Sequence, residues 1–272
     1  MTPKVSVLMP VLNPDPCYFE QAVESILRQS MPNWELIIPE DPSPRKASDT
    51  LKKFPDARIR HILNDNRTSL VSQLNQALHL ANGEYIARLD ADDIAEPNRL
   101  EEQCRALDEN TQLGVLGCQK TIIGSNGEVI GIRNYPLNHK DIITAICRYN
   151  PIAHPGVIMR RDLVYAVNGY SHDSRVRGAE DYDLWWRLLK TGVYFSNHPG
   201  RLIRYRIQPQ QTKIQQLHQQ LRATINIKRA NWSSLGELDK LRFFGELTLL
   251  KIPASLVIKL FFATTYSPVS HQ

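Results

Sequence analysis

Cysteine is scarce in this sequence, and its spacing suits neither metal binding nor a disulfide framework. The four cysteines among the 272 residues are Cys17, Cys104, Cys118 and Cys147, and no two of them form a C-x-x-C pair. Neither a zinc site nor a dense disulfide scaffold is therefore indicated. We expect a protein of the reducing cytoplasm.

Long hydrophobic runs are also missing. The amino-terminal apolar run, residues 5–12, ends in Asn-Pro, which is too soon for a spanning helix and too abrupt for a signal peptide. We interpret it as a buried first strand. No internal repeat occurs, but residues 208–220 are rich in glutamine and mark a change of character. The predicted organisation is a catalytic core over residues 1–207 and a helical carboxyl-terminal tail over residues 208–272.

The chain has no large excess of charge of one sign. It contains 33 basic and 28 acidic residues, and its formal net charge is +5. This mild excess suits anionic ligands or anionic lipid and gives no reason to expect nucleic acid as a partner. The apolar fraction of 42% and the charged fraction of 22% are those of an ordinary globular protein, and the length leaves room for an enzyme.

Short apolar runs alternate with longer amphipathic stretches in the first third of the chain. "VSVLMPVL", "WELIIP", "RIRHIL" and "EYIARL" have the length of buried strands, whereas "YFEQAVESILRQS", "ASDTLKKF" and "SLVSQLNQALHLA" have helical spacing. The alternation predicts an α/β fold with a mostly parallel central sheet flanked by helices. Ligands of such folds bind at the carboxyl ends of the strands.

The second half is less regular. "GVLGCQKTIIG" and "EVIGIRNY" read as a hairpin around "SNG", and "GVIMRRDLVYAV" reads as a strand that runs into a helix. "YDLWWRLLKTG" predicts an amphipathic helix that is closed by Gly192 in the left-handed conformation. Of the adjacent Trp185 and Trp186, we expect one in the core and the other facing a groove for an acceptor.

Three carboxylates follow the strand in "GEYIARLDADD". Asp90, Asp92 and Asp93 have a simple structural explanation, because aspartate is a good helix cap and a helical pattern follows. Capping needs only one of them, however, and three carboxylates in a small volume repel each other unless a cation neutralises them. Oxygen ligands suit Mg²⁺ or Mn²⁺, and such ions commonly share their coordination with substrate phosphates. We favour a metal site that takes a diphosphate ligand.

Seven motifs occur in the order and approximate spacing of family 2 glycosyltransferases of the GT-A (Rossmann-like) fold. They are "KVSVLMPVLN", "WELIIPEDPS", "GEYIARLDADDIAEPNRLEEQ", "HPGVIMRR", "NGY", "AEDYDLWWRLL" and "IRYRI". The chain resembles this family over residues 5–207. The resemblance implies a nucleotide-diphospho-sugar donor, a divalent cation (Mg²⁺ or Mn²⁺), and transfer with inversion at the anomeric carbon.

The resemblance assigns the donor side of the site. It implies that Asp90 and Asp92 are the D-x-D pair around Ala91, with Asp92 the direct metal ligand and Asp90 nearer the ribose and sugar. Asp41 corresponds to the aspartate that reads the base. The remaining nucleotide-binding positions lie in the turn after the first strand, namely Pro10, Leu12 and Asn13. A buried turn with no ligand contact is the alternative for Leu12.

The loop around Asp41 departs from the family pattern. The usual Asp-Asp-Gly-Ser is replaced by Glu40, Asp41, Pro42 and Ser43. Proline cannot adopt the backbone angles that are open to glycine, so the loop must differ here.

A second acidic site lies in "GAEDYDLW". Glu180, Asp181 and Asp183 would all favour the positive end of a helix dipole, which is the structural explanation for them. The resemblance instead identifies Asp181 as the catalytic base that removes the proton of the acceptor hydroxyl. Glu180 is then placed to orient the acceptor or the sugar hydroxyls. Asp183 points elsewhere on the helix.

Several further side chains accompany these motifs. His154 is either a satisfied structural histidine or, as the resemblance implies, a residue that lines the nucleotide-sugar donor pocket or the acceptor pocket. Arg206, with Arg204, matches a basic segment that can close over the diphosphate, although the histidine usual after this segment is replaced by Gln208. We expect Arg88 and Arg99 to brace the acidic loop as ion-pair partners.

The tail contains a helical pattern with a broad apolar face at residues 247–263. Two lysines and Pro253 make a spanning helix a poor interpretation. The pattern predicts either peripheral contact with the inner face of the plasma membrane or a helix docked on protein. Membrane contact would fit a lipid-linked acceptor, and a saccharide acceptor is equally compatible with the sequence.

The leading hypothesis is thus an inverting, metal-dependent glycosyltransferase of surface polysaccharide or glycolipid synthesis. A nucleotidyltransferase that makes activated sugars is one alternative, but it would need a loop rich in glycine and lysine after the first strand, and "VLNPDPCYF" has none. A non-catalytic sugar-nucleotide-binding protein is the other.

Overall fold

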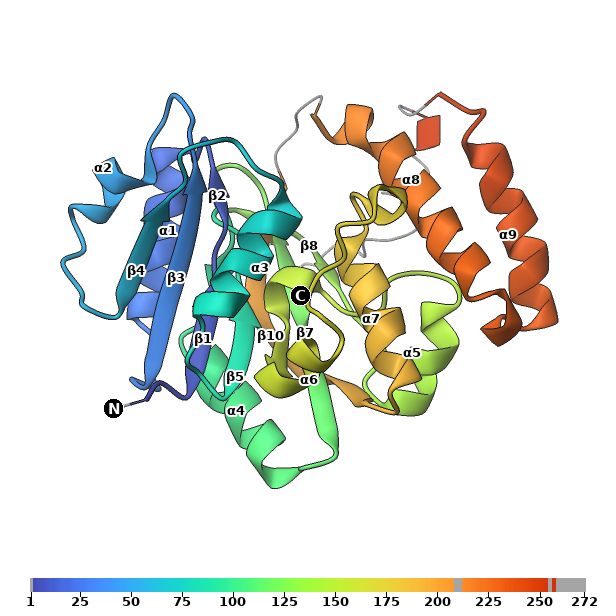
Figure 1. Cartoon of the computed structure of the whole chain (residues 1–272), viewed down its shortest axis with the longest axis horizontal. Helices are drawn as coiled ribbons and strands as arrows, with labels where there is room; N and C mark the ends of the chain where they lie inside the picture. Colours follow the sequence, from blue (N-terminus) through green and yellow to red (C-terminus); the bar gives the residue numbers. More distant parts are fainter. Residues whose placement is uncertain (1, 208–211, 254–255, 258–272) are drawn as a thin grey trace.

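One mixed sheet forms the centre of the molecule in a computed structural model that describes residues 2–207, 212–253 and 256–257 (Figure 1). The strands of this sheet are β1 Val5–Leu8, β2 Val11–Leu12, β3 Trp34–Asp41, β4 Ile59–Leu63, β5 Tyr85–Arg88, β6 Ile94–Ala95, β7 Leu113–Ile123, β8 Val129–Arg133, β9 Ile158–Arg160 and β10 Tyr194–Arg206. Their order is β2-β3-β1-β5-β9-β7-β10-β6, with β4 beside β3 and β8 beside β7.

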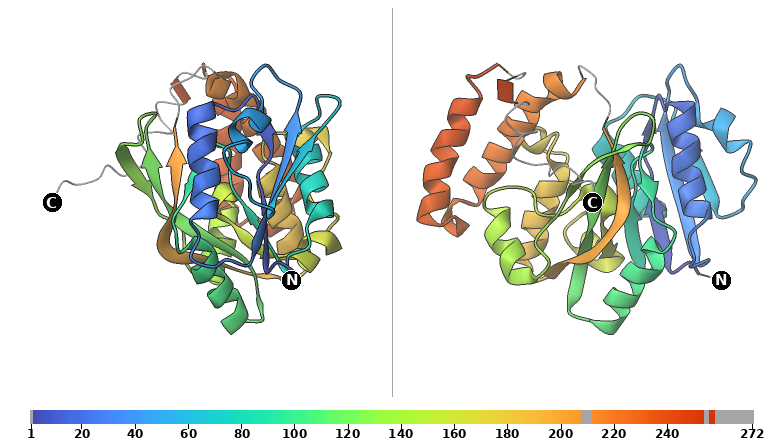
Figure 2. Two further views of the ribbon diagram at one scale, coloured as in Figure 1. Left: turned by 90° about the vertical axis from the view of Figure 1, so that its left-hand side faces the viewer. Right: turned by 180° about the vertical axis from the view of Figure 1, so that it is seen from behind.

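Helices cover both faces of the sheet. They are α1 Pro16–Leu27, α2 Ala47–Leu51, α3 Leu70–Leu80, α4 Arg99–Glu109, α5 His139–Ile146, α6 Arg161–Ala166, α7 Glu180–Lys190, α8 Thr212–Ala230 and α9 Glu237–Leu249. Short 3₁₀ turns lie at η1 His154–Gly156, η2 Ser174–Val176 and η3 Trp232–Ser234. In Figure 1, α3 and α6 lie in front of the sheet, and the view from behind in Figure 2 shows α1 and α4 on its other face.

The apolar core is divided between the two faces of the sheet. One cluster joins α1 and α4 to alternate strand residues such as Val7 and Ala87. The other joins α3, α5 and α7 to the intervening residues, among them Leu8 and Ile86. Because successive side chains of a strand point to opposite faces, strands covered on both sides read as continuous apolar runs. The α/β prediction is confirmed.

The sheet is parallel where the sequence predicted it most clearly. β1 pairs in parallel with β3 and β5, and β3 pairs in parallel with β2 and β4. Beyond β5 the sheet is mixed, because β9 runs antiparallel to both β5 and β7 while β10 runs parallel to β7. The carboxyl ends of β1, β3 and β5 therefore meet at one edge.

The predicted first strand is interrupted at Pro10. β1 ends at Leu8 and β2 covers only Val11–Leu12, although both keep the same register against β3, with Leu8 opposite Ile37 and Val11 opposite Glu40. Proline has no N–H to donate to the ladder. The prediction of one strand over residues 5–12 is corrected to two short strands.

Local signals account for the other predicted elements. Asp15 accepts hydrogen bonds from the N–H groups of Cys17 and Tyr18 and so caps α1. β7 and β8 form the predicted hairpin, with Gly127 at φ 84° in its turn. Gly192 follows α7 at φ 81°, as the left-handed termination requires.

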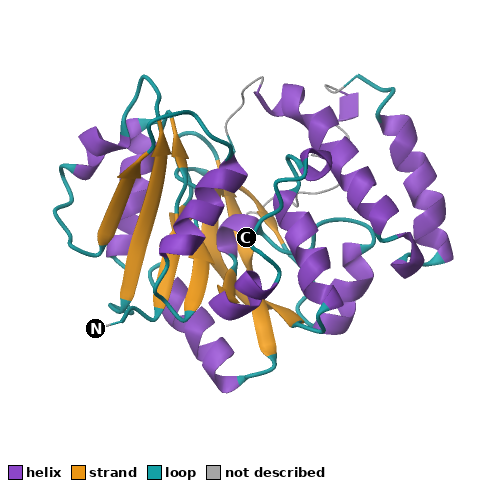
Figure 3. Ribbon diagram, in the orientation of Figure 1, coloured by secondary structure: helices purple, strands orange, loops and turns teal. Residues whose placement is uncertain are grey.

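The tail helices α8 and α9 lie at the opposite end of the molecule from α2 and β4 (Figures 1 and 3). Ala223 and Ile227 of α8 belong to the same apolar cluster as Tyr182 and Trp186 of α7. Of the predicted amphipathic stretch 247–263, residues 254–255 and 258–263 lie outside the described residues, and α9 ends at Leu249. None of the described helices has the length and apolarity to cross a membrane.

Candidate functional site

The three aspartates that follow β5 lie together. One carboxylate oxygen from each of Asp90, Asp92 and Asp93 can be chosen so that all three atoms lie within 4.8 Å of one another. The N–H of Asp93 donates to the carbonyl of Asp90 at 3.2 Å, which closes a tight turn. The capping explanation fails, because α4 begins only at Arg99, after the short strand β6. The cluster therefore needs another explanation.

Arg88 is the counter-ion of this cluster on one side. Its Nη1 lies 2.5 Å from Oδ1 of Asp90, and only 3% of the side chain is exposed. Burial alone would lower the pKa of Arg88, but the negative charge of Asp90 more than offsets it and the pKa is raised. The predicted ion pair of Arg88 is confirmed.

Arg99 supports the same loop by different contacts. Its Nη2 donates to the carbonyls of Arg88 at 2.8 Å and Val157 at 3.2 Å, and its Nε donates to Gln103. Burial lowers its pKa to about 10. Among the described residues Arg99 has no carboxylate partner, so its predicted role as an ion-pair partner is wrong, although it does brace the end of β5.

Arg206 lies beneath the acidic loop at the end of β10. Its backbone N–H donates to Oδ1 of Asp93 at 2.8 Å, and its Nε donates to the carbonyl of Asp92 at 2.9 Å. The other guanidinium nitrogens donate to the carbonyls of Gly124 and Ser125 and to Gln21. These contacts make Arg206 a support of the loop backbone. Its contact with a diphosphate stays a prediction, and Arg204 pairs with Glu96 at 2.7 Å.

Asp93 has a buried carboxylate oxygen without a hydrogen-bond partner among the described residues. Its side chain is fully buried, and within the described chain its Oδ2 has no hydrogen-bond partner. Burial and the neighbouring charges of Asp90 and Asp92 raise the pKa of Asp93 well above its usual value. An orphaned buried oxygen behind two half-buried carboxylates fits a divalent cation held by oxygen ligands alone. Mg²⁺ and Mn²⁺ both meet this description.

Two adjoining cavities lie at this edge of the sheet, and both are bordered by Pro10 and Leu12. The smaller, of about 310 Å³, has Asn13, Ala91 and Asp92 among its other lining residues. The larger, of about 660 Å³, has Asp41, Thr68 and Glu180 among its other lining residues. We call the two cavities together the cleft. The cleft is thus bordered by six of the predicted donor positions, Pro10, Leu12, Asn13, Asp41, Ala91 and Asp92, and by Glu180 of the second acidic site. Asp90, His154, Arg206 and Asp181 are not among its lining residues.

The loop that follows β3 is held against the turn that follows β2. Asn13 has a φ of 50°, its N–H donates to Oγ of Ser43 at 3.0 Å, and its Oδ1 accepts from the N–H of Arg45 at 3.2 Å. Asp41 accepts at 2.7 Å from the N–H of Thr68 and at 2.8 Å from Nδ2 of Asn64. The loop expected to differ from the family pattern is therefore a bonded part of the cleft wall.

Asp181 occupies the first turn of α7. Its Oδ2 accepts from Nδ2 of Asn150 at 2.6 Å, and its Oδ1 accepts from the N–H of Tyr182 at 2.8 Å. Burial and the adjacent charge of Glu180 raise the pKa of Asp181 to about 6. Asp183 instead pairs with Arg187 at 2.7 Å, so it points elsewhere on the helix as predicted.

His154 lies in η1 and packs against aromatic side chains. Its Nε2 lies 2.9 Å from Oη of Tyr170, and its ring stands edge-on to Trp185 with centroids 6.2 Å apart. Burial and the charge of Arg88 lower the pKa of His154, so the ring is neutral. These contacts are those of a structural histidine, and its contact with a ligand stays a prediction.

The expectation for the tryptophan pair is wrong in one respect. Trp185 is fully buried and Trp186 is 5% exposed, so neither faces a groove. Trp185 packs toward His154 and Phe195, whereas Trp186 packs toward Tyr182 on the side of α7 that the tail helices cover.

Other residues of the site were not predicted from the sequence. Asn150 and Tyr170 touch the predicted residues Asp181 and His154, and the cleft is also lined by Arg67, Arg177, Gln219 and Gln220. Tyr170 lies within the quoted "NGY", which is the one signal that could have found it. The two glutamines come from α8, so the tail borders the cleft.

Known proteins are similar to this chain in sequence and in fold. Residues 6–167 match the model of glycosyl transferase family 2. The chain belongs to glycosyl transferase family 2. EpsE of Bacillus subtilis, a putative glycosyltransferase, is 37% identical over 70% of this chain and 68% of its own length. WbnJ of Escherichia coli, an O-antigen biosynthesis glycosyltransferase, is 31% identical over 77% of this chain and 82% of its own length.

Solved glycosyltransferases have the same GT-A fold. Staphylococcus aureus TarS in complex with UDP-GlcNAc superposes with a TM-score of 0.62 at 18% identity, covering 82% of this chain and 66% of that chain. The mannosyltransferase PcManGT from Pyrobaculum calidifontis, in complex with GDP-Man and Mn²⁺, superposes with a TM-score of 0.63 at 16% identity, covering 97% and 76%. That TarS chain comprises residues 1–349, and this protein covers 39% of a longer TarS chain. Family membership decides against the nucleotidyltransferase alternative.

Proposed function

We propose that this glycosyltransferase moves a sugar from a nucleotide-diphosphate donor to an acceptor hydroxyl, with inversion at the anomeric carbon. The observation that carries the proposal is the shared cleft, since Asp92 borders one of its cavities and Glu180, next to Asp181, borders the other. An inverting displacement needs a base on the face opposite the leaving group. The presence of two separate acidic sites near one cleft supports such an arrangement.

Asp90 and Asp92 are the residues that we propose to hold a divalent cation. When bound, the ion would neutralise negative charge on the diphosphate. The nucleoside would lie along Pro10, Leu12 and Asn13 toward Asp41. The contacts of Asp41 with Thr68 and Asn64 fix its carboxylate before the donor arrives, which limits the entropy lost on binding.

Asp181 is the proposed base. Its carboxylate would accept the proton of the acceptor hydroxyl while that oxygen forms a bond to the anomeric carbon, and the bond from that carbon to the diphosphate oxygen would break with its electron pair leaving on the diphosphate. A pKa of about 6 leaves Asp181 mostly ionised at neutral pH yet more basic than an exposed aspartate. Glu180, whose Oε2 accepts from the N–H of Gly178, is placed to orient a hydroxyl.

The proposed acceptor is a saccharide or a lipid-linked saccharide of surface polysaccharide synthesis. The name of the relative WbnJ supports this class of pathway. An apolar strip on α9 supports a membrane-bound form of the acceptor, because Leu238 and Leu241 are each 68% exposed and Phe244 is 58% exposed. Residues three apart on a helix are neighbours, so the strip is continuous. We propose that it contacts an anionic lipid surface.

Donor binding and transfer can be tested separately. A thermal-shift screen of nucleotide diphosphates with and without Mn²⁺ should find a base whose stabilising effect depends on the metal. Asp92→Ala should remove that dependence. Asp181→Asn should abolish transfer from the matching nucleotide sugar and leave the thermal shift intact, whereas Asp183→Asn, on the same helix, should retain transfer. Normal transfer by both Asp92→Ala and Asp181→Asn would refute the mechanism.

The membrane contact has its own test. The double variant Leu241→Gln and Phe244→Gln should float less than the parent protein with vesicles that contain anionic lipid. Leu137→Gln changes a side chain that is 45% exposed elsewhere on the surface and serves as the control. Equal flotation of all three proteins would show that the strip does not bind lipid.

A further inference from the structure

We propose that Asn150 is a positioning residue for the base Asp181, and that the tail helices α8 and α9 hold the segment that carries Asn150. This inference rests on the proposed role of Asp181. It assigns the tail a part in catalysis that is separate from membrane contact. The contacts that carry it form a chain from α9 to the carboxylate.

The contact at the base is directional. Nδ2 of Asn150 donates to Oδ2 of Asp181 at 2.6 Å, and Oδ1 of Asn150 accepts from the N–H of Ile152 at 3.2 Å. The second bond fixes which end of the amide faces the carboxylate. With Oδ1 of Asp181 held by the N–H of Tyr182, both oxygens are oriented and each keeps acceptor capacity for an incoming hydroxyl.

The segment that carries Asn150 has no regular structure of its own. It follows the end of α5 at Ile146 and precedes η1. On one side α7 holds it, since Oη of Tyr182 donates to the carbonyl of Ile146. On the other side it meets the tail. The position of such a loop depends on the helices that contact it, here α7 and the tail helices.

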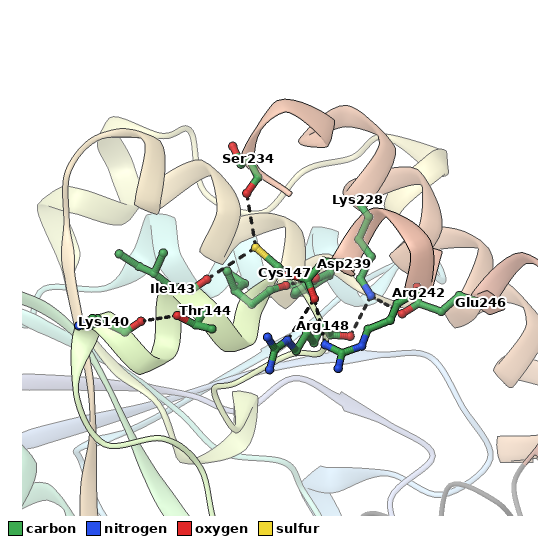
Figure 4. A network of polar contacts seen from close by, with 12 residues as sticks. Lys140, Ile143, Thr144, Cys147, Arg148, Lys228, Ser234, Asp239, Arg242 and Glu246 are labelled. Atoms are coloured by element: carbon green, nitrogen blue, oxygen red, sulfur yellow. Dashed lines mark hydrogen bonds and ion pairs between the residues drawn. The ribbon is translucent and has the colours of Figure 1, made fainter. Parts of the chain in front are cut away.

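Two residues of the tail helices form hydrogen bonds with Arg148, which is two positions before Asn150 (Figure 4). Nζ of Lys228 in α8 donates to the carbonyl of Arg148 at 2.8 Å. Oδ1 of Asp239 in α9 accepts from Nε of Arg148 at 3.1 Å. Glu246 of α9 lies 2.5 Å from Nζ of Lys228 and neutralises it. We call Lys228, Asp239 and Glu246 the tail clamp.

The burial of Lys228 favours a specific role over general packing. Its side chain is 2% exposed, and burying a charged pair is often no more stabilising than burying apolar residues of the same size. An apolar side chain could fill the same space, but only a donor such as the ammonium group can hold a backbone carbonyl of another segment in one position. The carbonyl that it fixes belongs to the loop that reaches the base.

Charges from several elements face Asp181. Glu180 of its own helix raises the pKa of Asp181, whereas Arg88 of β5 and the bond from Asn150 lower it, and Tyr170 lies within electrostatic reach. Loss of the Asn150 bond therefore raises the pKa of Asp181. The base is then protonated at a higher pH, so the acid limb of the pH–rate profile moves to higher pH.

The test uses the full chain and the nucleotide sugar that the wild-type protein accepts. Asn150→Ala should move the midpoint of the acid limb of kcat upward by about 0.5–1 pH unit, the shift expected for one lost hydrogen bond, with little change in KM for the donor. Asn150→Asp should move it further, because it places a second negative charge beside the base. Lys228→Met should move it in the same direction.

Controls separate positioning from general stability. Lys240→Met removes a surface pair with Glu237 on α9 and should leave the midpoint unchanged. Should Lys228→Met fail to fold, Arg148→Met removes the contact with Asp239 at a half-exposed side chain and should give the shift instead. An unchanged midpoint in Asn150→Ala would overturn the role of Asn150, and unchanged midpoints in the clamp variants would overturn that of the tail. A wild-type protein without transferase activity would instead refute the proposed function.

Discussion

Asp93→Asn should have opposite effects on stability with and without metal. The substitution keeps an oxygen that can accept the N–H of Arg206 and replaces the orphaned Oδ2 with an NH₂ group. That group can donate toward Asp90 or Asp92, so one repulsive contact becomes attractive. We therefore expect the variant to be more stable than the wild-type protein in the absence of divalent cations.

The size and pH dependence of this gain follow from the burial of Asp93. A buried acceptor without a partner costs about 1–3 kcal/mol, so even the low end corresponds to an increase in Tm of about 2–4 °C. Because the folded protein raises the pKa of Asp93, the penalty is absent below the ordinary pKa of aspartate and grows as the pH rises. The gain should therefore be seen at pH 7.5 and vanish toward pH 4.

Thermal unfolding in EDTA measures the stability without metal, and thermal unfolding in Mn²⁺ measures the stabilisation by the ion. A ligand at 100 times its Kd stabilises the folded protein by about 2.7 kcal/mol, and the increment should be smaller in Asp93→Asn because one negative charge near the ion is gone. Asp162→Asn, at a side chain that is 92% exposed, is the control. A variant that is less stable than the wild-type protein in EDTA, or that gains as much from Mn²⁺, would refute the reasoning.

Three further predictions follow from individual residues. Transfer should fall tenfold per pH unit below about pH 6, where Asp181 becomes protonated, and the pH profile of kcat/KM measures this. Arg206→Met should weaken Mn²⁺ binding about 10-fold in a titration, because the acidic loop loses its supporting donors. Gly83→Ala should lower the urea midpoint of unfolding, since a Cβ would lie 2.5 Å from the backbone nitrogen of Ser6.

The amino-terminal half of the fold could be predicted because its signals are local. Each buried strand is a short apolar run, and α1 and α3 each carry an apolar stripe and a side-chain cap. The error at Pro10 has the same origin, since apolarity continues through residues 5–12 while the missing N–H interrupts the ladder. An apolar run indicates which residues are buried, but whether they pair in a sheet depends on the backbone N–H groups, and proline has none.

The long strand β10 could not be predicted in the same way. It spans Tyr194–Arg206 and contains Pro199 and Gly200, which normally indicate a turn. In the structure the strand continues past these two residues, and its register against β7 shifts between His198 and Ile203. Irregularities of this kind are set by the partner strand. The quoted "IRYRI" marked only the end of the strand.

The contrast between local sequence signals and features set by distant segments also applies to the site. Residues within the family motifs were predicted, whereas Asn150 lies outside every motif and the two glutamines of α8 lie in the glutamine-rich segment that the sequence marked only as a boundary. The wrong expectation for Trp186 arises likewise, because the second surface that covers α7 comes from the tail. Helical periodicity shows which face is apolar. It does not show how many neighbours a helix has.

The two acidic sites differ in how far the protein satisfies them by itself. At Asp181 both carboxylate oxygens already accept hydrogen bonds from the chain, whereas Oδ2 of Asp93 has no partner within the described residues. The proposed base is therefore oriented before any ligand binds, while the proposed metal site keeps electrostatic repulsion between its carboxylates that a cation would relieve. Arg88 acts on both sites, since it pairs with Asp90 and lowers the pKa of Asp181.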